Sequence, residues 1–214
     1  MPTATVPVAN SPAPSPPAPG APAVAAPVLT ATPSGFLNDY SKLKPSPHHR
    51  NTLYEQSPKL MTYTKFVVDP VVMLAKRINL GRLGDGLDLD TSAMLAKLAR
   101  DEVINSLKVN NQIVDQPGPG VARIRSAITG VGALAATGSL PSRFNAASVE
   151  VEIVDSVSGE RLAAAIEADQ VNPADLYDSG ASESMSGRYD LIRMVFTHWS
   201  SRMNLFFERA RRGE

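Results

Sequence analysis

The clearest pattern in the sequence is an alternation of apolar and acidic residues between positions 148 and 154. The apolar members are Val149, Val151 and Ile153, and the acidic members are Glu150 and Glu152. A period of two is typical of an antiparallel strand with one face on a core and the other in water. The pattern therefore predicts a strand whose two glutamates lie on the solvated face.

A hairpin is predicted directly after this strand. The polar sequence DSVSGE at 155–160 is typical of a turn, and the chain then returns as a strand over 161–167. Leu162, Ala164 and Ile166 are expected on the buried face of the returning strand. Residues 168–187 are polar and acidic, which predicts a loop.

Two segments show the helical period. Residues 91–107 predict a helix capped by Asp90 or Thr91. Residues 188–211 predict a longer helix whose apolar side chains fall within an arc of about 120°, with Trp199 at its centre. This aromatic stripe is more typical of a core than of a cofactor site. Glu102 falls inside the apolar arc of the first helix, where we expect its carboxylate either to reach the edge of the arc or to pair with a basic residue.

Shorter strands are predicted at 62–68, 112–115 and 121–129, and a long loop at 130–145. In the third of these strands Arg123 and Arg125 lie on the face opposite the apolar residues. A wide helical face and a one-sided hairpin need each other to bury their apolar surfaces. The expected fold is an α+β two-layer sandwich, with two main helices packed on one face of a mixed, mostly antiparallel sheet.

The N-terminal segment has a different composition. Residues 1–34 contain no charged residue and hold 10 of the 18 prolines. Such a sequence has little to bury and cannot form a helix or a central strand. We therefore expect a disordered Pro/Ala-rich tether at 1–34, dispensable for folding, and a single domain at 35–214. Phe36, Leu37 and Tyr40 open this domain and are expected to anchor the N-terminal segment onto the rest of it.

The overall composition excludes several classes of protein. Lys and Arg total 21 and so do Asp and Glu, so no net charge favours nucleic acid. The absence of cysteine excludes disulfides and thiolate metal sites within this sequence. No apolar run is long enough to span a bilayer. Contact with a membrane is expected only through an anchor that this sequence does not contain.

No catalytic, cofactor or metal motif is complete. Gly118-Pro119-Gly120 lacks the rest of a phosphate-binding loop, and His48-His49 lacks a third ligand at metal spacing. We therefore expect no cofactor and no metal. Glu102, or the pair Glu150 and Glu152, could serve an enzyme, although a solvated face is the commoner role of such a pair. The candidate surface contacts are Arg123, Arg125, Glu150 and Glu152.

Four stretches together resemble one bacterial family. They are SGFLNDYSKL at 34–43, FVVDPV at 66–71, VDQPGPGVARIR at 114–125 and EIVDSVSGERL at 152–162. In this order they resemble a family of lipoproteins of unknown function, domain of unknown function 3313. The resemblance implies an exported envelope protein tethered by a lipidated cysteine before a Pro/Ala-rich linker. It implies no activity and no catalytic residues.

The favoured interpretation is a non-enzymatic protein on the periplasmic side of the bacterial cell envelope. Its partners are expected to be proteins or other envelope components, which it binds or scaffolds. Two alternatives remain open. One is an envelope enzyme with an unrecognised carboxylate site, and the other is a cytosolic binding domain with a disordered leader.

Overall fold

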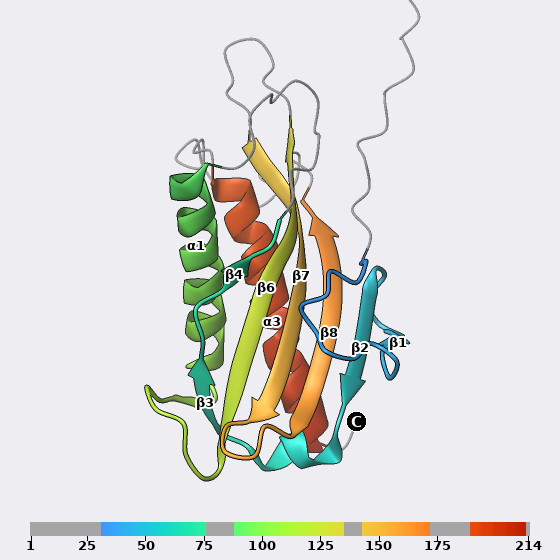
Figure 1. The fold of residues 1–214 in the computed structure, drawn as a ribbon, viewed down its shortest axis with the longest axis vertical. Helices are drawn as coiled ribbons and strands as arrows, with labels where there is room; N and C mark the ends of the chain where they lie inside the picture. Colours follow the sequence, from blue (N-terminus) through green and yellow to red (C-terminus); the bar gives the residue numbers. More distant parts are fainter. Residues whose placement is uncertain (1–30, 76–87, 135–142, 172–188, 213–214) are drawn as a thin grey trace, which may run out of the picture.

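The structure is a computed structural model that describes residues 31–75, 88–134, 143–171 and 189–212 (Figure 1). The two main helices are α1 (Leu89–Leu107) and α3 (Asp190–Arg212), and a short 3₁₀ helix, η1, covers Pro58–Thr62. The strands are β1 (Lys44–Pro45), β2 (Thr52–Gln56), β3 (Lys65–Val68), β4 (Val72–Met73), β5 (Gln112–Ile113), β6 (Val121–Leu134), β7 (Arg143–Asp155) and β8 (Arg161–Gln170).

These strands form one mixed sheet in the order β1-β2-β8-β7-β6-β3-β5, with β4 also paired to β6. The four adjacent pairs β1-β2, β2-β8, β8-β7 and β7-β6 are antiparallel. In contrast, β3 pairs in parallel with β5 and β6, and β4 pairs in parallel with β6. Both main helices lie on one face of this sheet (Figure 1). The expected α+β fold, with two helices on one face, is confirmed.

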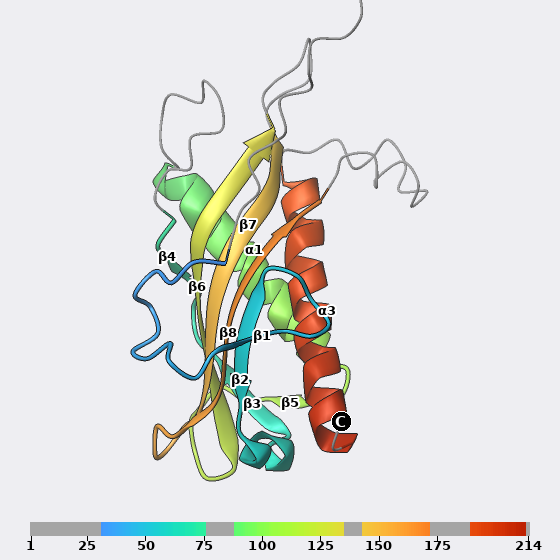
Figure 2. The ribbon, with the colours of Figure 1, turned by 90° about the vertical axis from the view of Figure 1, so that its right-hand side faces the viewer.

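The opposite face of the sheet is called the outer face below. Figure 2 shows α3 on one side of the sheet and the chain before β1 on the other side. The apolar clusters agree, because two of them lie between sheet and helices and a third joins Leu37 to Ala164 and Ile166. Among the described residues no helix is both long and apolar enough to cross a membrane.

Helix α1 begins earlier than the sequence suggests. Asp88 is the N-cap, and its carboxylate accepts a hydrogen bond from the Thr91 backbone N–H at 2.6 Å. The predicted caps, Asp90 and Thr91, are therefore wrong, because they lie inside the first turn. Asp88 satisfies one of the N–H groups that every helix leaves free at its start.

Two of the predicted loops are shorter than expected. Strand β6 continues to Leu134 and β7 begins at Arg143, so both ends of the predicted loop at 130–145 are strand. The pairing of β6 with β7 shifts register between Ile128 and Gly130 and again between Gly132 and Ala133. Glycine tolerates such irregular positions, so this segment stays in the sheet despite its turn-like composition. Strand β8 likewise extends to Gln170, while residues 172–188 lie outside the described part.

The alternation along β8 is broken at its start. Ile153 pairs with Ala163 but Val154 pairs with Arg161, so Leu162 is an extra residue at a bulge. Leu162 and Ala163 consequently both join the cluster on the helix side, whereas Ala164 and Ile166 lie on the outer face. The expectation that Leu162, Ala164 and Ile166 share one face is wrong, because one extra residue reverses the alternation.

The centre of α3 tests the helix–sheet core. Trp199 is 8% exposed and its ring lies 5.3 Å from that of Phe196, whereas the neighbouring His198 is exposed. We expect Trp199→Ala to lower the free energy of unfolding by about 3–5 kcal/mol, because it empties a large buried volume. His198→Ala, the matched control, should cost under about 1 kcal/mol. Urea denaturation measures both, and equal small losses would contradict this role of α3.

Candidate functional site

The candidate site lies where residues 31–43, called the strap below, cross the outer face of the sheet. Figures 1 and 2 show this segment running over β8 on the side away from the helices. Beneath it the side chain of Glu150 on β7 is 0% exposed, and Glu152 is 5% exposed. The expected solvated face for these two glutamates is therefore wrong, because the strap covers it.

The carboxylate of Glu150 is bound by the strap itself. The Ser34 backbone N–H donates to Oε1 at 2.5 Å, and the Leu37 N–H donates to Oε2 at 3.3 Å. The Tyr40 hydroxyl donates to the same Oε2 at 2.7 Å. A buried carboxylate is tolerated only where such donors replace water, so Glu150 and the strap depend on each other.

Tyr40 also holds the shape of the strap. Its hydroxyl oxygen accepts hydrogen bonds from the backbone N–H groups of Gly35 at 2.8 Å and Leu37 at 3.1 Å. Gly35 adopts φ +93°, a conformation that favours glycine. Burial, together with the hydrogen bond to Glu150, raises the pKa of Tyr40. The hydroxyl therefore stays protonated and available as a donor at neutral pH.

Apolar contacts complete the strap's attachment. Leu37 is buried against Ala164 and Ile166 of β8, and further half-buried side chains pack around these three. They come from the strap and from β2: Ala31, Phe36, Tyr40, Leu43 and Leu53. The expectation that Phe36, Leu37 and Tyr40 attach the N-terminal segment to the domain is confirmed.

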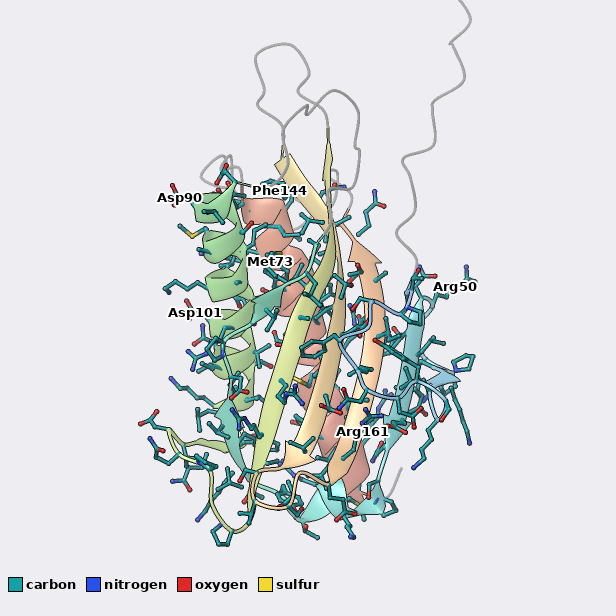
Figure 3. All side chains as sticks on the ribbon, viewed as in Figure 1. Arg50, Met73, Asp90, Asp101, Phe144 and Arg161 are labelled. Atoms are coloured by element: carbon teal, nitrogen blue, oxygen red, sulfur yellow. The ribbon has the colours of Figure 1, made fainter. Side chains whose placement is uncertain are left out.

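Glu152 is held by two arginines. Arg125 on β6 donates to it at 2.8 Å from the directly paired position, and Arg161 on β8 donates to it at 2.9 Å. Arg161 also donates to Glu55 at 2.9 Å and to the backbone oxygen of Asp39 at 2.8 Å. Figure 3 labels Arg161 on the viewer's side of the sheet, with the helices behind. This cluster of charges thus joins four strands, β2, β6, β7 and β8, to the strap.

The four candidate contact residues share the outer face but have different surroundings. Arg125 and Glu152 form a cross-strand pair, Arg123 instead pairs with Asp69 at 2.9 Å, and Glu150 is buried under the strap. A shallow polar hollow of about 520 Å³ lies beside the strap and contains three of the four. Its lining is Asn38, Arg123, Arg125, Glu152 and Val154, with Asp155–Gly159 of the β7–β8 turn. A contact of these residues with a partner stays a prediction.

One wall of this hollow is held by several hydrogen bonds to a single carboxylate. In the β7–β8 turn, Asp155 accepts hydrogen bonds from the backbone N–H groups of Val157 and Ser158 and from the Tyr63 hydroxyl. These bonds, chiefly that from the Ser158 N–H, lower the pKa of Asp155 to about 2. The turn therefore keeps its charge and its shape across the physiological pH range.

Comparison with known families places the fold in context. Residues 32–193 match the model of the family DUF3313, whose description is 'Protein of unknown function'. The chain belongs to this family. Because the match begins at Thr32, it includes nearly the whole strap as well as the sheet.

Solved structures with a similar arrangement are distant. The PelC dodecamer from Paraburkholderia phytofirmans is 12% identical, with a TM-score of 0.41 and coverage of 72% of this chain and 96% of that chain. Protein XCC0632 from Xanthomonas campestris is 10% identical, with a TM-score of 0.42 and coverage of 71% and 87%. A minor lipoprotein from Acinetobacter baumannii is 14% identical, with a TM-score of 0.34 and coverage of 70% and 93%. Among curated proteins none matches.

The other candidates from the sequence are structural. Glu102 lies 3.8 Å from Arg193 and accepts a hydrogen bond from Thr197, so of the two roles expected for it the structure shows the pairing with a basic residue. His48 and His49 are exposed, and the described residues contain no group of three or more His, Cys, Asp or Glu able to hold a metal. The turn at Gly118–Gly120 leads into strand β6 and not into a helix.

Sequence reasoning missed the covering of the outer face. One signal for it lies in β8, whose outward positions are Ala164, Ile166 and Ala168. A strand face in water would carry polar residues at these positions. Small and apolar residues there indicate that another layer packs on the sheet.

A second polar cluster joins β8 to α3. Arg202 forms ion pairs with Glu167 and, at 2.7 Å, with Asp169, and His198 lies 3.6 Å from Asp169. Burial raises the pKa of Glu167 to about 7, although the positive charge of Arg202 acts in the opposite direction. The pKa of this carboxyl group is therefore brought near neutrality.

The strap's attachment can be tested at Glu150. In Glu150→Gln an amide N–H faces groups that are themselves donors, so we expect a loss of about 1–3 kcal/mol in the free energy of unfolding. Hydrogen exchange should show loss of protection at the Ser34 and Leu37 amides. Glu160→Gln, which breaks only an exposed pair with Lys59, should cost under about 1 kcal/mol. Unchanged protection at both amides would show that Glu150 does not hold the strap.

The half-buried Glu167 predicts a pH dependence of stability. Its folded-state pKa, about 7, lies above its ordinary value of 4.5, so between these pH values the folded protein holds a proton that the unfolded chain has lost. The free energy of unfolding should therefore fall as pH rises from 4.5 to 7, by roughly 1–3 kcal/mol, and then level off. Glu167→Gln should remove this slope, as measured by denaturation at several pH values. Identical slopes in both proteins would contradict the assignment.

Proposed function

We propose that this protein is a non-enzymatic component of the bacterial cell envelope, on the periplasmic side, that binds or scaffolds partner proteins. One observation carries the proposal. The buried carboxylate of Glu150 is occupied by the strap, which joins the Pro/Ala-rich N-terminal sequence to the centre of the sheet. This arrangement suits a domain that is held by a tether and presents its surface.

The surroundings of the acidic groups favour a structural role. A catalytic acid or base must reach the proton that it transfers, but Glu150 is fully buried and bound to the strap. Glu152 is shared by Arg125 and Arg161, and Glu102 contacts Arg193 and Thr197. Each carboxylate that the sequence offered for catalysis is thus engaged in holding segments of the fold together.

The hollow beside the strap is the contact surface that we propose. Arg123 donates from Nε to Asp69, and Arg125 donates from one terminal nitrogen to Glu152. Among the described residues neither side chain makes a further hydrogen bond, and both line the hollow, with the Arg125 guanidinium also 5.7 Å from the centre of the Phe36 ring. Guanidinium N–H groups bind carboxylates with good geometry. The surface therefore fits an acidic side chain on a partner protein.

The location in the envelope rests on sequence. The family resemblance implies exported lipoproteins, and the composition before Ala31 is that of a tether. Cell fractionation with antibody detection should place the protein in the envelope fraction. Recovery of all the protein from the cytosol would overturn this part of the proposal.

Cross-linking in cells tests the contact surface. The chain lacks cysteine, so Ser158→Cys places a single thiol at the exposed rim of the hollow, and Asn105→Cys places a control thiol on the exposed side of α1. We expect a thiol cross-linker to join the first variant, but not the second, to an envelope protein. Arg123→Ala should reduce this product several-fold without a change in stability above about 1 kcal/mol.

Two results would contradict the proposal. Equal cross-linking from both cysteine positions would show that the hollow is not a contact surface. Turnover of generic ester, phosphate or glycan substrates by the purified protein, lost in Glu152→Gln, would favour an enzyme.

A further inference from the structure

The contact between strap and sheet divides the chain into two parts. All strap residues come before β1, and the residues that hold them, such as Glu150, Arg161 and Ile166, come after residue 51. The strap is held through two backbone N–H groups, one hydroxyl, the backbone oxygen of Asp39 and a few apolar side chains. Nothing in these contacts requires that the strap and the outer face belong to the same chain.

The connection between the two parts is a six-residue hinge, residues 46–51, near the upper end of β2, where Figure 3 labels Arg50. Five of its six residues are exposed, and Pro45 and Pro47 stiffen its start. Asn51 has φ +59°, which costs energy in a residue other than glycine. Only two residue pairs join β1 to β2 beyond this hinge. Short, strained hinges of this kind favour exchange of a segment between identical chains.

We propose that residues 31–45 exchange between two copies of this protein, so that the strap of each copy occupies the outer face of the other. The exchanged dimer keeps every hydrogen bond to Glu150 and every apolar contact of Leu37. It differs from the monomer in the conformation of residues 46–51 alone, where the strain at Asn51 is relieved.

Concentration decides between the two forms. A strap on its own chain competes at an effective concentration of about a millimolar. Chains in dilute solution should therefore be monomers. Copies held close together by N-terminal tethers on a surface reach comparable local concentrations, and exchange then becomes favourable. This step rests on the tethering to a surface proposed above, but not on partner binding at the hollow, which the exchanged strap would line in the same way through Asn38.

Single cysteines make the exchange visible. Lys42 on the strap and Gln56 on β2 are both exposed and both line a second hollow, of about 480 Å³, which is separate from the contact surface described above. One chain carries Lys42→Cys and a second, differently tagged chain carries Gln56→Cys. A short bismaleimide can then join two different chains only after exchange. A pair with Lys97→Cys on α1 in place of Gln56→Cys is the control, because Lys97 lies on the helical side.

The test uses the full chain with an N-terminal histidine tag on phosphatidylcholine vesicles that contain a nickel-chelating lipid. We expect the Lys42–Gln56 product on densely covered vesicles to exceed that in micromolar solution at least tenfold. The Lys42–Lys97 product should stay at background. Glu150→Gln in the chain that carries Gln56→Cys should reduce the product several-fold, because the outer face of that chain no longer binds a strap well.

A hinge replacement gives a second measurement. Six prolines in place of residues 46–51 form an extended rod of about 19 Å that cannot fold back, so this variant should be a dimer by light scattering. Six Gly/Ser residues at the same position should leave a monomer in dilute solution. The proposal is overturned if the proline variant stays monomeric, or if wild-type hinges give no cross-link above the Lys97 control on vesicles.

Discussion

The burial of one carboxylate is the constraint on which the rest of the structure depends. Glu150 lies on β7, a strand in the middle of the sheet, and its side chain has no access to water. A charge in that position is tolerated only if hydrogen bonds replace its solvent. The strap supplies them from Ser34, Leu37 and Tyr40. Sheet and strap are consequently parts of one unit, although more than 100 residues separate them in sequence.

The two faces of the sheet are covered by different physical means. The helix side is closed by apolar packing, in which Phe196, Trp199 and Phe207 of α3 fill the space above the strands. The outer face combines a small apolar cluster around Leu37 with a charged one around Glu152 and Arg161. Directed bonds on this face fix where the strap lies, which apolar packing alone would define less sharply.

Local irregularities show where sequence patterns fail and why. The two-residue alternation correctly placed Arg123 and Arg125 opposite the core, because β6 is regular through that stretch. It failed in β8, where a bulge at Leu162 turns Ala164 and Ile166 to the other face. A bulge depends on the pairing between two strands, and the sequence of one strand does not reveal it. The same holds for the glycines of β6, which pairing with β7 keeps in the sheet.

The sequence by itself determined the hairpin of β7 and β8, the two amphipathic helices, the α+β class and the family motifs. These follow from periodicity and turn chemistry, which are local properties. Only the tertiary structure decided the fate of Glu150 and Glu152. Alternation shows that two side chains share a face of a strand, but what covers that face depends on contacts between distant segments. Here the covering segment is SGFLNDY, and its contact with β7 turns an apparent solvated surface into a buried site.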